Sequence, residues 1–143
     1  MSYPSDEVSA RVVSLFAAIN RRYARESEAA AAAHDLTPLQ AKALLAAADP
    51  VPMRAVAERL HAEPSNVTAM VDRLEERGLV ERRPSPADRR VKLVVATAAG
   101  LAAIGELRAA MPFATDPLAP LDAEQREALC RLLELMAGPD PQP

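Results

Sequence analysis

The segment of residues 64–97 constrains the fold of this 143-residue chain more than any other segment. Apolar residues recur along its first half at steps of three and four, which places them on one face of a helix beginning at Ser65. These inward-facing residues are Val67, Met70, Val71 and Leu74. Gly78 follows them, and glycine readily adopts the positive φ that ends many helices. The pattern therefore predicts a helix that buries one face and ends at Gly78.

Two short strands are expected after this helix. Residues 91–96 are rich in β-branched side chains, and a polar turn containing prolines separates them from residues 79–83. The predicted hairpin carries Asp88, Arg89 and Arg90 at its tip. Asp88 is expected to pair with Arg90 or a neighbouring arginine and so to hold its direction.

Positive charge is concentrated on this hairpin, although the whole chain has a net charge of −3. Five cations and one acid lie between Arg82 and Lys92, which is a local balance of +4. Such a cluster can neutralise phosphates of a nucleic acid. It can also be a solvated turn without a partner, so the charge alone leaves both interpretations open.

A helix with a polar amino end, followed by a basic hairpin, suits duplex DNA. Ser65, Asn66 and Thr68 would reach base edges in the major groove, and Arg73 would contact the backbone. An arginine at the hairpin tip would enter a minor groove, where negative potential is concentrated. The alternative is an ordinary solvated helix with Ser65 as its N-cap.

The composition and the positions of proline and glycine predict the elements in the rest of the chain. Aromatic residues make up 3% and tryptophan is absent, so small aliphatic residues must form a core of closely packed helices. Prolines and glycines divide the sequence into further helices, expected at residues 6–33, from Asp35 or Thr37 onwards, at 54–60, at 97–110 and from 121 or 122 to 137. The fold class predicted is mainly α with a small β-hairpin, and the tail 139–143 is expected to be disordered.

Several classes of function are disfavoured. No phosphate-binding loop or nucleophile–base pair is recognisable, and His34, His61 and Cys130 form no zinc ligand set, so neither an enzyme nor a metal or other cofactor is expected. No apolar run approaches 18 residues and the amino terminus lacks a basic region, so no membrane partner or export is expected. With one cysteine, a reducing cytoplasm is the expected location, and Cys130 is expected to be a buried thiol of the last helix.

The run VDRLEERGLVERRPSPADRRVKLVVAT, residues 71–97, resembles the winged helix-turn-helix of the MarR family of bacterial transcriptional regulators. The order of elements fits that family over about residues 8–137. The resemblance implies a DNA-binding regulator, most often a repressor. By position, it places Ser65, Asn66 and Thr68 at the major groove, Arg73 near phosphate and Arg90 in the minor groove. Ala69 and Ala96 depart from the residues common in the family.

The resemblance also implies a homodimer and a small-molecule effector. Apolar stripes in the first and last helices would be left exposed by a single lobe of this length, which supports dimerisation on physical grounds. The implied ligand lies between the dimer and DNA-binding lobes, with Arg11, Arg22, Tyr23 and His34 as candidate lining residues. Each of these four can instead be a surface or interface residue.

The resulting division is a dimerisation helix at residues 1–34, a DNA-binding lobe at 35–97 and closing dimerisation helices at 98–138. The competing hypothesis is a winged helix that binds proteins and has lost specific DNA binding. The retained wing arginines oppose this hypothesis, whereas Ala69, Glu75 and Glu76 support it.

Overall fold

The structure, a computed structural model, describes residues 7–139. Its elements are α1 (Glu7–Ala33), α2 (Pro38–Ala46), β1 (Val51–Pro52), α3 (Met53–Leu60), α4 (Pro64–Glu76), β2 (Val80–Pro84), β3 (Lys92–Ala96), α5 (Ala98–Ala110), α6 (Pro112–Thr115) and α7 (Ala123–Ala137). The predicted class, mainly helical with a small β-hairpin, is confirmed. Asp6 and residues 140–143 of the expected disordered tail lie outside the described residues.

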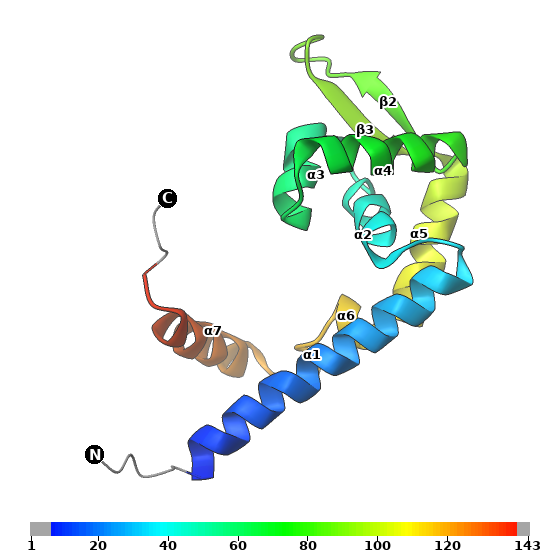
Figure 1. The fold of residues 1–143 in the computed structure, drawn as a ribbon. Coiled ribbons are helices and arrows are strands. Elements are labelled where there is room, and N and C mark those ends of the chain that lie inside the picture. The colour runs from blue at the N-terminus through cyan, green and yellow to red at the C-terminus, as the bar shows by residue number, and fades with distance from the viewer. Residues whose placement is uncertain (1–6, 140–143) are drawn as a thin grey trace.

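Helices α2, α3 and α4 form a compact lobe beneath the sheet (Figure 1). Thr37 caps α2 through a capping box with Gln40, whereas Asp35 has a φ of 54° and ends α1. Val67, Val71 and Leu74 of α4 are fully buried, as predicted, and Met70 is half-buried. Ile104 and Leu107 of α5 join the same core, so α5 is fastened to this lobe.

The sheet has three antiparallel strands in the order β1–β3–β2, not only the two of the predicted hairpin. Val80 pairs with Ala96 and Pro84 with Lys92 along the hairpin, while Val51 of β1 pairs with Val94. A strand of two residues, one of them proline, is too short to show an alternating pattern. Its position follows from the tertiary packing.

The hairpin is fixed at its base by Thr97 and two glycines. The Thr97 hydroxyl donates a hydrogen bond of 2.6 Å to the Gly78 carbonyl and accepts one of 3.1 Å from the Gly100 N–H. Gly78 has a φ of 71°, as predicted for the residue ending the helix. A Cβ atom on Gly100 would lie 1.9 Å from the Leu79 carbonyl oxygen, so the backbones approach where only glycine fits.

Helix α7 and the amino-terminal part of α1 lie away from this lobe, whereas the end of α1 packs against it (Figure 1). α7 buries none of its residues, and α1 buries only Ala30 and Ala31 near its end. The two helices border an apolar groove of about 390 Å³. Its lining residues include Val12, Phe16, Ile19, Phe113, Leu129 and Leu133.

Candidate nucleic-acid interface

The first turns of α4 present polar side chains to solvent. Ser65, Asn66 and Thr68 are all exposed, and the burial of the opposite face of α4 fixes their direction. The Thr68 hydroxyl donates a hydrogen bond of 3.0 Å to the Pro64 carbonyl, which leaves its oxygen free to accept another. Arg73 is exposed one to two turns further on and forms no ion pair with the described residues.

The start of α4 differs in detail from the expectation. Its N-cap is Glu63 and its first residue is Pro64, so the alternative of Ser65 as an N-cap is wrong. Proline has no N–H, and the Asn66 N–H already donates to the Glu63 carbonyl at 3.0 Å. Fewer free N–H groups therefore face an approaching phosphate, and recognition must depend more on side chains.

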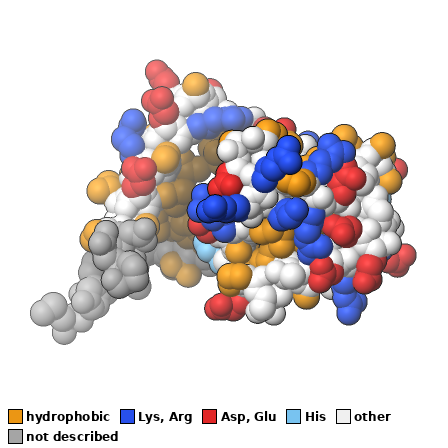
Figure 2. All heavy atoms as spheres, turned by 90° about the horizontal axis from the view of Figure 1, so that it is seen from above, with side chains coloured by type: hydrophobic (Ala, Val, Ile, Leu, Met, Phe, Trp, Pro, Cys, Tyr) orange, Lys and Arg blue, Asp and Glu red, His pale blue; other side chains and the backbone are white. Residues whose placement is uncertain are grey.

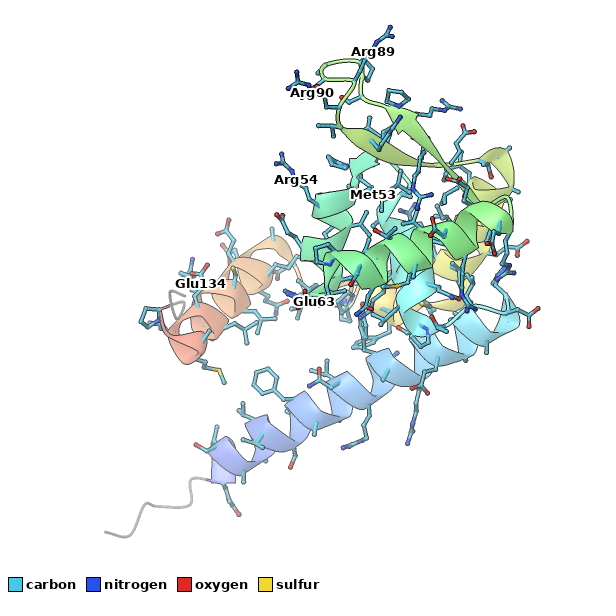
Figure 3. All side chains as sticks on the ribbon, turned by 45° about the horizontal axis from the view of Figure 1, so that its top comes forward. Met53, Arg54, Glu63, Arg89, Arg90 and Glu134 are labelled. Atoms are coloured by element: carbon cyan, nitrogen blue, oxygen red, sulfur yellow. The ribbon has the colours of Figure 1, made fainter. Side chains whose placement is uncertain are left out.

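The wing, formed by β2, β3 and residues 85–91 between them, holds its arginines away from the lobe. Arg89 and Arg90 project from its tip, and both are exposed (Figure 3). The Asp88 carboxylate accepts a 3.0 Å hydrogen bond from the backbone N–H of Arg90 and forms no ion pair within residues 7–139. The predicted guanidinium pairing is therefore wrong, because Asp88 orders the turn through the main chain instead.

Arg54 is a candidate phosphate contact that the sequence reasoning missed. It lies exposed in the first turn of α3, and Figure 3 shows it projecting from the same side of the lobe as Arg90. The first helix of a helix-turn-helix crosses the DNA backbone, and this rule is the signal that could have identified Arg54. Viewed from above, basic side chains gather over this face of the lobe (Figure 2).

A second candidate site is a cleft of about 180 Å³ between the lobe and α1. Tyr23 and Ser27 of α1 line it together with Lys42 of α2 and Arg108 of α5. The Lys42 ammonium lies 5.7 Å from the centre of the Tyr23 ring. Two cations, an aromatic ring and hydroxyl groups suit a small anionic organic molecule.

Of the four residues predicted for such a cleft, only Tyr23 lines it. The Arg22 guanidinium stacks 4.2 Å from the Phe113 ring centre, and His34 Nε2 lies 3.3 Å from Glu106 Oε2. Arg11 is exposed on α1, nearer its amino end. The helical period of α1 directs Arg11 and Arg22 away from the cleft. Lys42 and Arg108 were not predicted as lining residues, because they come together only through tertiary packing.

Cys130 is exposed on α7, and its thiol donates to Glu134 Oε1 at 3.6 Å. The prediction of a buried thiol is therefore wrong for the single chain, because α7 packs no residue into a core. Within residues 7–139, no three or more His, Cys, Asp or Glu side chains are grouped to hold a metal ion. No helix in the same range combines the length and apolar character needed to span a membrane.

Known proteins share both the sequence of the lobe and the fold of the chain. Residues 36–92 match the model of the MarR family. CouR from Rhodococcus jostii RHA1, bound to p-coumaroyl-CoA, is 26% identical with a TM-score of 0.69 over 100% of both chains. The transcriptional repressor CouR bound to a 23-mer DNA duplex is 27% identical, with a TM-score of 0.64 over 96% of this chain and 100% of that chain.

A probable transcriptional regulator from Pseudomonas aeruginosa is 29% identical, with a TM-score of 0.59 over 90% of this chain and 98% of that chain. No curated protein sequence matches the chain. The family consists of transcriptional regulators rather than enzymes. The resemblance seen in residues 71–97 is thus confirmed, because residues 36–92 match the MarR family and the solved structures with the same fold include MarR-family transcriptional regulators.

Proposed function

We propose that this protein is a sequence-specific regulator of transcription that binds double-stranded DNA as a homodimer. The observation that carries the proposal is the exposure of arginines at the wing tip and on α3, which project from the same side of the lobe and form no ion pair with any residue of 7–139 (Figure 3). A structure of 27% identity, the repressor CouR, is bound to a DNA duplex, which supports the same activity here.

In the proposed complex, the amino-terminal half of α4 enters the major groove. Ser65, Asn66 and Thr68 read base edges there, while Arg73 contacts the backbone. Arg90 enters the neighbouring minor groove and Arg89 contacts phosphate beside it. Asp88 sets the direction of Arg90 through the backbone hydrogen bond between them.

The dimer is supported by the apolar side chains that α1 and α7 leave in solvent. Leu15 is 56% exposed, Ile19 48%, Leu132 58% and Leu135 80%. A second copy would cover this surface about a two-fold axis and present two recognition helices to an inverted-repeat operator. The division into dimerisation helices at 1–34 and 98–138 and a DNA-binding lobe at 35–97 follows from the same proposal, although α5 also packs into the lobe.

We further propose that the protein is a repressor and that a small anionic effector, bound in the cleft beside Tyr23, releases it from DNA. The cleft joins α1 to α2 and α5, so an occupant can alter the position of the lobe relative to the dimer. CouR is bound to p-coumaroyl-CoA, which combines an aromatic acyl group with anionic phosphates, and this supports an effector that is both aromatic and anionic. Lys42→Ala should weaken the release of DNA by aryl carboxylates about tenfold or more, because it removes a cation beside the carboxylate.

The proposal is tested by fluorescence anisotropy with duplex DNA from upstream of the protein's own gene, beside a scrambled duplex, over a salt series. We expect tight binding of the upstream duplex alone, with an affinity that falls steeply as salt rises. Equally weak binding of both duplexes, or none at low salt, would favour the winged helix that binds other proteins.

A further inference from the structure

Arg82 points from the wing onto the recognition helix. Its Nη2 atom lies 2.5 Å from Asp72 Oδ1, and its Nη1 atom lies 3.4 Å from Glu75 Oε2. The Arg82 side chain is 25% exposed, less than the 53% of Asp72 and the 43% of Glu75. Of the five cations that make the hairpin basic, Arg82 is thus committed to two carboxylates of the same chain.

Those carboxylates follow the base-reading side chains along the same face of α4. Asp72 is four residues after Thr68 and Glu75 is seven residues after it, which keeps all three on one side of a helix. Each turn advances about 5.4 Å, so Asp72 lies close behind the residues placed at the groove. Without a counter-ion, both carboxylates would repel the phosphates that flank the groove.

We propose that Arg82 is an internal counter-ion of the recognition helix, and that it promotes DNA binding by cancelling Asp72 and Glu75. It is a positioning residue and not a phosphate contact. Arg83, the next residue, lies on the other side of the strand and pairs with Glu81, so it serves as a matched control. The inference rests on the proposed DNA-binding function.

The test is a mutant cycle on the duplex that the unaltered protein binds, followed by anisotropy at low and moderate salt. R82A should weaken binding about tenfold at low salt, and salt should reduce this loss by screening the exposed carboxylates. D72N/E75Q should bind at least as tightly as the unaltered protein. R82A/D72N/E75Q should bind within about threefold of D72N/E75Q, since no charge is left to cancel.

Three results would overturn the inference. If the triple variant is as weak as R82A, Arg82 contacts phosphate or fixes the wing mechanically. If D72N/E75Q alone weakens binding, the contact is needed for its geometry and not its charge. If R83A weakens binding as much as R82A, only net charge matters. Thermal unfolding of every variant shows that the lobe is folded, and failure of the unaltered protein to bind any duplex would overturn the proposed function itself.

Discussion

The winged lobe buries its apolar side chains, whereas the two helices α1 and α7, which together form the α1–α7 region, leave many of theirs exposed. The lobe closes a core in which Leu44, Leu74 and Leu107 are each 0% exposed. The α1–α7 region leaves Leu135 80% and Met136 61% exposed. The lobe therefore buries its core within one chain, whereas the proposed second copy would have to cover the apolar side chains that α1 and α7 leave exposed.

The largest expected effect tests the packing of the winged lobe. Gly100→Ala should lower the free energy of unfolding by about 3 kcal/mol or more, because the new Cβ would clash with the Leu79 carbonyl. Gly105→Ala on the same helix meets nothing within 4 Å and should raise it by about 0.5–1 kcal/mol. Urea unfolding followed by circular dichroism measures both. Equal effects of the two substitutions would show that the close approach at Gly100 does not constrain the lobe.

The next prediction tests the exposed apolar surface of α1. Ile19→Asp should convert a dimer into a monomer while leaving the lobe folded, because it places a charge in the middle of the apolar stripe. Ser14→Asp, on the opposite side of α1, should leave the dimer intact. Size-exclusion chromatography with light scattering gives the mass of each. A variant Ile19→Asp that stays dimeric would place the interface elsewhere.

A smaller effect is expected at the wing. Arg90→Ala should weaken DNA binding by about 1–3 kcal/mol, because it removes the side chain that we propose to enter the minor groove. Arg21→Ala on α1 removes the same charge far from the wing and should change affinity by less than about 0.5 kcal/mol. Anisotropy titrations at one salt concentration compare them. Unchanged affinity for Arg90→Ala would remove the wing from the binding mechanism.

The smallest effect concerns the connection between the two regions. Arg77, after the end of α4, donates hydrogen bonds of 2.7 Å to the His34 carbonyl and 2.9 Å to the Asp35 carbonyl at the end of α1. Arg77→Ala should lower stability by about 1 kcal/mol, since the site is exposed. We expect it to weaken DNA binding without changing the salt slope, because the Arg77 guanidinium is bound to the carbonyls at the end of α1 and is not among the proposed phosphate contacts. A slope reduced by about one would instead identify Arg77 as a DNA contact.

The sequence predicted the lobe well because its signals are local. The helical spacing of Val67, Val71 and Leu74 and the turn at Gly78 are short-range patterns, and the structure has both. The start of α2 was also predicted, since Thr37 was one of the two candidate caps and it is the observed N-cap.

The features that the sequence did not predict depend on contacts between distant segments. β1 exists only because β3 lies beside it, and the cleft brings Lys42 and Arg108 together from separate helices. Asp88 was expected to pair with a side chain but bonds to a backbone N–H, a choice that charge patterning cannot distinguish. Cys130 was placed in a core that the single chain does not form around α7.

The most direct test of the central claim is footprinting of the bound duplex with dimethyl sulfate and hydroxyl radicals. We expect two protected major-groove patches about one helical turn apart, flanked by minor-groove protection that Arg90→Ala removes. A single patch, or protection that is uniform along the duplex, would contradict recognition by two copies that each use α4 and the wing.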